Sequence, residues 1–408
     1  MRIHVKLQGS PIHTPEPPIL TLMFCGYILL SFFESYLVRF IGSSTKYFLL
    51  LMLGLWVYCE NYKVRLNILS SAVTVWFIYK VISIAWSSME NNDVRAHLFS
   101  QIGMVLLVAV VTSRVRSREF LRLALRADYA GSFLFGVLSI IFRRPYLYEF
   151  LTSRQVLTLW GQQMDPNNCA AFLAIAVGLG AYSLFCEKKR RLLNAVVVLV
   201  NSGAIILTGS RGGFLLAGLL IAAAMLLPNW NMRALGMDLV KRIAVMLAVT
   251  LAGLVLLGRY TNVLQDGLAR LLAFDNYEGG SERTDLWAIA LTHFKRHPLF
   301  GCGWGGYAIR DGIPVHNTYL TILCDTGLIG FAVFITPVIY IGCYALKKRA
   351  LSAVLLLLIS LVPACTLDSI NKRYFWNAII LAFMVIRYIR ETGRYVQIWD
   401  DDETNGSV

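Results

Sequence analysis

A single arginine, Arg211, lies in a glycine-rich turn between two long apolar segments. Residues 208–213 read TGSRGG, and glycines allow the tight backbone geometry that such a turn needs. A guanidinium group at the edge of a membrane is costly unless it has a partner, and its planar fork suits the oxygens of a phosphate group. The turn is therefore a candidate phosphate site. An arginine that merely extends toward lipid headgroups is an equally weighted alternative.

A second cation, Arg283, begins a segment with the pattern of an amphipathic helix. Residues 283–296 place apolar side chains near one face, and Ser281 is the expected N-cap; the apolar residues are Leu286, Ile289, Ala290 and Phe294. A cation at the positive end of a helix is unfavourable unless an anion binds there as well. Two interpretations stay open: Arg283 binds an anionic ligand, or it pairs with a neighbouring carboxylate or with lipid phosphate.

His316 precedes a further long apolar segment, and an acidic residue, Asp325, lies inside that segment. A neutral imidazole can take a proton from a hydroxyl group at neutral pH, although a lone histidine at an interface is more often structural. Asp325 lies about 13 Å further along a helix that rises about 1.5 Å per residue. A carboxylate at that depth needs a partner or a proton, and the intramembrane candidates for the partner are Lys80 and Arg126.

The remaining polar motifs have structural explanations. Asp165 is a natural N-cap for a helix with Pro166 in its first turn, and a role in shaping a site is secondary. The glycine-rich residues 301–306 lack the strand and helix of a dinucleotide loop and are predicted to form a turn. No set of histidines, cysteines and carboxylates has the spacing of metal ligands, so we expect no metal and no other cofactor.

The composition indicates a membrane protein. The chain has 408 residues, of which 57% are hydrophobic and 15% charged, whereas about a quarter of the residues in a soluble domain are charged. A soluble protein with a single core is therefore excluded. The net charge of +14 would suggest nucleic acid as a partner of a soluble protein, but here the basic residues lie between apolar segments. These basic residues indicate which loops lie on the cytoplasmic side of the membrane, and we expect no nucleic-acid partner.

The apolar segments predict an all-α polytopic membrane protein with about 12 (10–12) transmembrane helices and a short extracytoplasmic loop that contains the amphipathic helix. Two segments, 45–59 and 99–112, are short for a full crossing. The expected spans are 19–36, 45–59, 68–86, 99–112, 119–142, 166–186, 192–208, 213–228, 243–258, 316–346, 350–367 and 375–390.

The distribution of lysine and arginine predicts the orientation. One set of alternate loops carries more than twice as many of these residues as the other, when the long loop 259–315 is left out. Both termini are therefore expected in the cytoplasm. The same alternation places Asp165, Arg211, the loop 259–315 and His316 on the outer side, at one level of the membrane.

The ordered motifs of this chain resemble those of the O-antigen ligase and O-antigen polymerase superfamily of bacterial membrane glycosyltransferases, which also contains protein O-oligosaccharyltransferases. The resemblance covers residues 160–345, and the order of the motifs makes it specific. The family commonly has glutamate where this chain has Asp325, a conservative departure. The motifs are Asp165-Pro166-Asn167, Gly209-Ser210-Arg211-Gly212, Gly280-Ser281-Glu282-Arg283 with Trp287, His297-Pro298-Leu299 with Gly301 and Gly303, and His316-Asn317 with Leu320, Asp325, Gly327 and Gly330.

The resemblance implies a GT-C-type fold and a reaction. A glycan would pass from a polyprenyl (undecaprenyl) diphosphate carrier to an acceptor hydroxyl group on the outer face of the bacterial cytoplasmic membrane, with inversion and without a metal. Arg211 and Arg283 would bind the diphosphate and His316 would be the base, which suits the chemistry of these side chains. Asp325 would be intramembrane support. The substrate-binding candidates are Asn317, Arg310, Tyr319, Asp165, Asn167 and Trp287.

The resemblance also implies an organisation and a set of partners. Residues 1–158 would form N-terminal transmembrane helices, 159–346 the catalytic core with loop 259–315, 347–390 C-terminal transmembrane helices and 391–408 a cytoplasmic tail. The expected partners are a lipid-linked oligosaccharide donor, a glycan, lipid or protein acceptor, the bilayer, a flippase and a chain-length regulator.

Two alternatives to the favoured function stay open. The first is an O-antigen ligase that joins the glycan to a lipid core, a wall polymer or a protein. Ligases of the family that this chain resembles often carry a longer outer loop before the histidine than the one between Arg283 and His316, so the resemblance favours a polymerase of surface polysaccharide repeat units. A transporter or flippase of a lipid-linked anion would belong to another class, and it predicts an inverted repeat that the sequence does not reveal.

Overall fold

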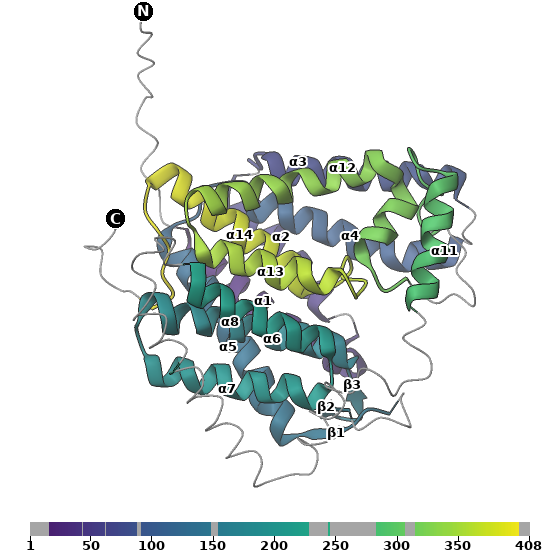
Figure 1. The fold of residues 1–408 in the computed structure, drawn as a ribbon. Helices are drawn as coiled ribbons and strands as arrows, with labels where there is room; N and C mark the ends of the chain where they lie inside the picture. The colour runs from purple at the N-terminus through teal and green to yellow at the C-terminus, as the bar shows by residue number, and fades with distance from the viewer. Residues whose placement is uncertain are drawn as a thin grey trace, which may run out of the picture.

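Helices form nearly all of the described chain. The computed structural model describes residues 16–42, 44–61, 63–87, 91–147, 154–227, 244, 283–306 and 315–399 (Figure 1). The helices are α1 (Pro18–Ile41), α2 (Ser44–Cys59), α3 (Ile68–Ile82), the 3₁₀ helix η1 (Ser83–Trp86), α4 (Asn91–Val111), α5 (Arg118–Ile141), α6 (Pro166–Tyr182), the π-helical turn η2 (Ser183–Glu187), α7 (Arg191–Thr208), α8 (Arg211–Leu226), α11 (Arg283–Arg296), α12 (Thr318–Lys347), α13 (Leu351–Ala364) and α14 (Arg373–Thr392); the strands are β1 (Arg143–Pro145), β2 (Gln155–Leu159) and β3 (Gln162–Gln163).

The predicted spans coincide with these helices, apart from 243–258, of which the structure describes residue 244 alone. Within the described part of the chain, six helices are long and apolar enough to cross a membrane, and four shorter helices are also apolar. A helical multi-pass membrane protein is therefore confirmed. The number of crossings stays a prediction, because several helices are shorter than a bilayer requires.

Helix α6 lies at the centre of one half of the bundle, where it contacts α5, α7, α8 and α13. Small side chains line α6, and they let neighbouring backbones approach closely. At Gly213 the approach leaves no room for a side chain, because a Cβ atom there would lie 2.3 Å from the Cβ atom of Ala170. The N-terminal ends of α6 and α8 are thereby held against each other.

A small antiparallel sheet between α5 and α6, which was not predicted, adds three short strands to an otherwise helical fold. Strand β2 pairs with both β1 and β3, and the β2–β3 turn consists of Trp160 and Gly161 with φ of 50° and 77°. The strands are too short to produce a detectable alternation of apolar and polar residues. Arg39, near the end of α1, donates a 2.9 Å hydrogen bond to the carbonyl of Trp160.

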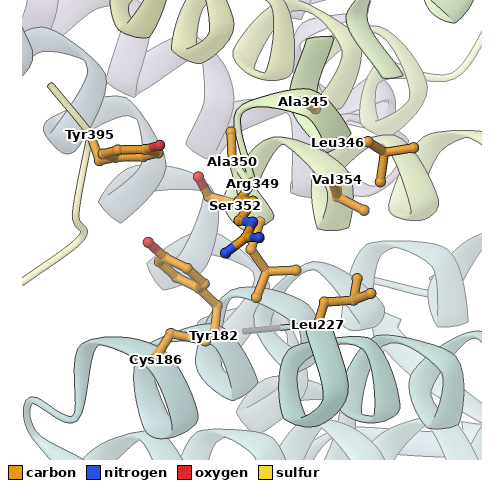
Figure 2. A pocket seen from close by; sticks show the side chains of 11 residues that line it. Tyr182, Cys186, Leu227, Ala345, Leu346, Arg349, Ala350, Ser352, Val354 and Tyr395 are labelled. Carbon is orange, nitrogen blue, oxygen red and sulfur yellow. The ribbon is translucent and has the colours of Figure 1, made fainter. Parts of the chain in front are cut away.

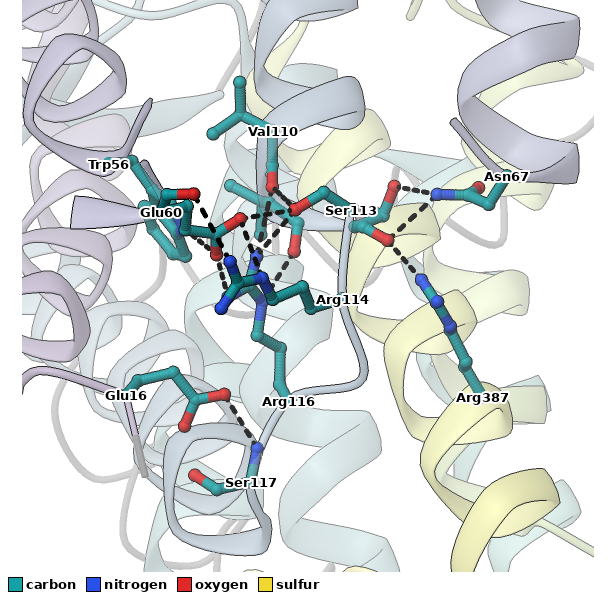
Figure 3. A network of polar contacts seen from close by, with 12 residues as sticks. Glu16, Trp56, Glu60, Asn67, Val110, Ser113, Arg114, Arg116, Ser117 and Arg387 are labelled. Atoms are coloured by element: carbon teal, nitrogen blue, oxygen red, sulfur yellow. Dashed lines mark hydrogen bonds and ion pairs between the residues drawn. The ribbon is translucent and has the colours of Figure 1, made fainter. Parts of the chain in front are cut away.

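The two ends of the bundle differ. Figure 1 shows α11 and the sheet at one end, and the C-terminal end of α14 at the opposite end. Figure 3 shows the buried carboxylate of Glu60, after α2, which accepts a 2.7 Å bond from Nη1 of Arg116 and a 3.0 Å bond from Oγ of Ser113. This contact joins the α2–α3 and α4–α5 connections, which the charge pattern assigns to the same side of the membrane.

Candidate active site

His316 lies in a strained turn immediately before α12. Its φ of 53° is unusual for a residue with a side chain, and such strain often occurs at functional sites. The next residue, Asn317, is the N-cap, and its Oδ1 accepts hydrogen bonds of 3.1 Å from the amides of Tyr319 and Leu320. The imidazole of His316 is half-buried. The turn and the cap together determine the position of His316 just before the first turn of α12.

Helix α11 brings Arg283 to this end of α12. The predicted amphipathic helix 283–296 is confirmed with the same bounds, and its buried residues Leu286 and Ala290 belong to its predicted apolar face. Ala290 packs with Val315 and Cys324, and the indole of Trp287 donates a 3.1 Å hydrogen bond to the carbonyl of Val315. The predicted cap, Ser281, lies outside the described residues.

Charged groups from three further parts of the chain change the pKa of His316. Burial is the main reason that the pKa of His316 is lowered from its ordinary value, and the positive charge of Arg283 lowers it further. Asp165, before α6, and Asp368, between α13 and α14, raise the pKa of His316 by a smaller amount. The structure therefore gathers a base, a cation and two carboxylates.

Asp165 and Arg211 begin two adjacent helices. Oδ1 of Asp165 caps α6 by accepting 3.0 Å hydrogen bonds from the amides of Asn167 and Asn168. Ser210, the N-cap of α8, donates a 2.9 Å hydrogen bond to Oδ1 of Asn167. Arg211 is therefore the first residue of a helix that starts beside Asp165, and its side chain is exposed.

The connection between α13 and α14 lies beside the starts of α8 and α12. A Cβ atom at Gly212 would lie 3.4 Å from Oγ1 of Thr366, which places the start of α8 next to this segment. Oγ1 of Thr318, the first residue of α12, donates a 2.7 Å hydrogen bond to the carbonyl of Leu367 and accepts one of 2.8 Å from the amide of Ser369. The starts of α8 and α12 thus lie beside the α13–α14 connection, and the start of α6 is joined to that of α8.

Comparison with known families supplies the decisive observation. The family model described as O-Antigen ligase matches residues 195–335. Residues 195–335 of this chain are therefore similar to the O-antigen ligase family. The match confirms the resemblance to the O-antigen ligase and polymerase superfamily and supports an activity of that general type. No curated protein matches the chain.

The O-antigen ligase match contains some of the site residues and not others. Arg211, Arg283 and His316 lie within it, whereas Asp165 and Asp368 lie outside it. Asp368 was not predicted from the sequence. A polar residue in a short connection between two apolar segments was the available signal, but many connections share it. The buried Oδ1 of Asp368 has no hydrogen-bond partner among the described residues.

Other predicted site residues make contacts that stabilise the fold. The hydroxyl of Tyr319 donates a 2.9 Å hydrogen bond to the carbonyl of Leu361 in α13. Tyr319, Trp287, Asn317 and Asn167 therefore each use a polar group within the protein. Arg310 lies outside the described residues, and a substrate role for each of the five stays a prediction.

The structure selects one of the two predicted partners of Asp325. Nζ of Lys80, in α3, lies 3.9 Å from Oδ2 of Asp325, and both side chains are buried. Arg126 was the wrong candidate, because its Nε donates a 2.6 Å hydrogen bond to the carbonyl of Ile398 and its guanidinium lies 5.2 Å from the ring centroid of Trp399. The predicted turn at residues 301–306 is confirmed.

A cavity of about 220 Å³ lies away from the candidate site residues. Figure 2 shows Tyr182, Arg349 and Tyr395 around it, near the junction of α12 and α13. That junction is at the end of α12 opposite His316, so this cavity is not part of the site. Among the described residues, no group of three His, Cys, Asp or Glu side chains could hold a metal ion.

Proposed function

We propose that this protein transfers a glycan from a polyprenyl diphosphate carrier to an acceptor hydroxyl group. The reaction takes place on the outer face of the bacterial cytoplasmic membrane, with both termini in the cytoplasm. The favoured acceptor is a second lipid-linked glycan, so that the product is a polymer of surface polysaccharide repeat units. The observation that carries the proposal is the grouping of Arg283, Asp165 and Asp368 around His316, next to the start of α8.

In this mechanism His316 is the general base. Its neutral imidazole takes the proton of the acceptor hydroxyl group while the hydroxyl oxygen attacks the anomeric carbon of the donor sugar. The lowered pKa of His316 keeps the imidazole neutral at neutral pH. The bond between the anomeric carbon and the diphosphate oxygen breaks on the opposite face, which inverts the anomeric configuration.

Arg283 and Arg211 act on the leaving group. Negative charge grows on the diphosphate as the glycosidic bond breaks, and guanidinium groups placed there stabilise the transition state more than the ground state. A bidentate fork also orients the diphosphate. The two carboxylates, Asp165 and Asp368, lie near the base, where they stabilise the imidazolium ion that forms. No metal is required in this mechanism.

A reconstituted assay tests the proposal. Purified protein in lipid nanodiscs receives a polyprenyl-diphosphate oligosaccharide as sole substrate, and products are resolved by gel and mass spectrometry. A ladder of multiples that is lost in the His316→Ala variant, but kept in the His293→Ala variant, supports a polymerase. Product that forms only after a lipid core, wall polymer or protein is added supports the ligase alternative. No product under either condition contradicts glycan transfer and favours the transporter alternative.

A further inference from the structure

Helix α12 is broken in its first half, and the loop after α11 fills the break. Gly327 has φ of 63° and ψ of −168°, a conformation outside the helix. The carbonyl of Asp325 accepts a 3.1 Å hydrogen bond from the amide of Gly303, and the amide of Leu328 donates one of 2.8 Å to the carbonyl of Pro298. Irregular backbone within a membrane protein must have its polar groups satisfied by the protein itself. Residues 298–305 do this for α12.

The side chain of Asp325 adds a second connection to the same loop. Its Oδ1 accepts a 2.9 Å hydrogen bond from the amide of Gly305, while Oδ2 faces Lys80 at 3.9 Å. Lys80 and Asp325 are each only 3% exposed. Nζ of Lys80 also lies 4.4 Å from the ring centroid of Trp304 and 5.2 Å from that of Trp76. The ammonium group is thus enclosed by a carboxylate and two aromatic faces.

Helix α3 and η1 hold the loop from the other side. Oγ of Ser83 accepts a 2.9 Å hydrogen bond from the amide of Trp304. Oγ of Ser87 donates a 2.7 Å hydrogen bond to the carbonyl of Trp304. The hydroxyl of Tyr79 donates a 3.1 Å hydrogen bond to the carbonyl of Phe300. The N-terminal part of the chain, outside the O-antigen ligase match, therefore determines the position of a loop inside that match.

This arrangement connects the two residues that the proposed mechanism needs most. Helix α11, which begins with Arg283, continues directly into the loop, and α12, whose break receives the loop, begins just after His316. We propose that Lys80 and Asp325 are positioning residues for the transfer, because they fix this loop and thereby the spacing between Arg283 and His316. The inference rests on the proposed function for its catalytic consequence, but the anchoring of the loop can be measured without any activity.

Two matched double variants test the proposal. Lys80→Met/Asp325→Asn and Lys80→Met/Asp325→Leu both remove the two buried charges together, which avoids an unpaired charge in either protein. The asparagine keeps an acceptor for the amide of Gly305, and leucine of similar volume does not. The variants therefore differ in one hydrogen bond to the loop.

The first measurement is hydrogen–deuterium exchange in nanodiscs, with α6 as the internal reference. We expect faster exchange at residues 302–305 in the leucine variant than in the asparagine variant, with equal exchange in α6. The second measurement is steady-state transfer. We expect kcat of the leucine variant to be lower by about tenfold or more, with a similar KM for the donor, because misplaced catalytic groups slow the chemical step.

Each outcome bears on the proposal. Equal exchange at residues 302–305 in the two variants overturns the anchoring role of Asp325, and faster exchange with equal kcat overturns the positioning role. Faster exchange in a protein whose wild-type form makes no product supports the anchor and contradicts the proposed function instead. If the leucine variant does not fold, the Lys80→Met/Asp325→Asn variant is compared with the wild-type protein, because it lacks the Lys80–Asp325 contact and keeps an acceptor for the amide of Gly305. Faster exchange and lower kcat are then expected, and wild-type values for both overturn the proposal.

Discussion

Oγ of Ser210 lies 2.9 Å from Oδ1 of Asn167, and the same hydroxyl oxygen accepts a 3.2 Å hydrogen bond from the amide of Gly213. One side chain thus caps α8 and ties it to the start of α6. Two motifs that are separate in the sequence meet at this contact, and Arg211 follows it directly. The position of Arg211 therefore depends on a neutral hydrogen bond between two helix caps.

Ser210→Ala is expected to destabilise the protein by about 1–2 kcal/mol, because it removes an N-cap and leaves Asn167 without its hydroxyl donor. Thermal denaturation in detergent measures this loss. Thr336→Ala is the matched control, since its exposed hydroxyl donates a hydrogen bond to the carbonyl of Ala332 in its own helix. An equal melting temperature for the two variants would contradict the role of Ser210.

The transfer rate is expected to fall as pH drops below about 6.5, the ordinary pKa of histidine. The base is active when neutral, and burial together with Arg283 lowers the pKa of His316 in the free protein, so the acidic limb of kcat/KM should lie below that value. Asp368→Asn removes a negative charge that raises this pKa, as Asp165 also does. The acidic limb of the pH profile of the Asp368→Asn variant should therefore lie at still lower pH than that of the wild-type protein. A shift to higher pH would contradict the assignment of His316.

Arg283→Lys is expected to lower kcat by about 100-fold although the charge is kept, because an ammonium group cannot replace a planar fork on a diphosphate. Arg211→Lys should behave in the same direction. Arg296→Lys, at the exposed far end of α11, is the control and should transfer normally. Full activity of the Arg283→Lys protein would exclude the bidentate contact.

Chelation with EDTA is expected to leave the transfer rate unchanged, because guanidinium groups neutralise the leaving diphosphate in the proposed mechanism. The rate is measured in nanodiscs before and after chelation, and again after Mg²⁺ or Mn²⁺ is added. Activity that disappears with EDTA and returns only with a divalent cation would show that the arginines are insufficient.

Gly327→Ala is expected to destabilise the protein by about 3 kcal/mol or more. Its φ and ψ suit glycine alone, and a Cβ atom there would lie 2.3 Å from the carbonyl oxygen of Leu299. Gly393→Ala is the control, because its φ is also positive but its surroundings are open. That variant should lose only about 1 kcal/mol. Similar losses in chemical denaturation would mean that the loop can move away from Gly327.

The local parts of the fold could be predicted from the sequence. Helix 283–296 and the N-cap at Asp165 depend on spacing over one or two turns, and the chain states that spacing directly. The family resemblance likewise depends on residue types and their order, and the match over residues 195–335 confirms it. The break in α12 could not be predicted, because it needs the carbonyls and amides of a loop that precedes the helix.

The sequence by itself determined that this is a helical multi-pass membrane protein with a segment similar to the O-antigen ligase family, with an arginine in the α7–α8 turn and a histidine before α12. Only the tertiary structure decided that Asp325 pairs with Lys80 and not with Arg126, and that Asp368 lies near His316. The physical reason is that apolar helices look alike whether they face lipid or each other. Their pairing is decided by a few polar and small residues far apart in the chain, and no local pattern records those contacts.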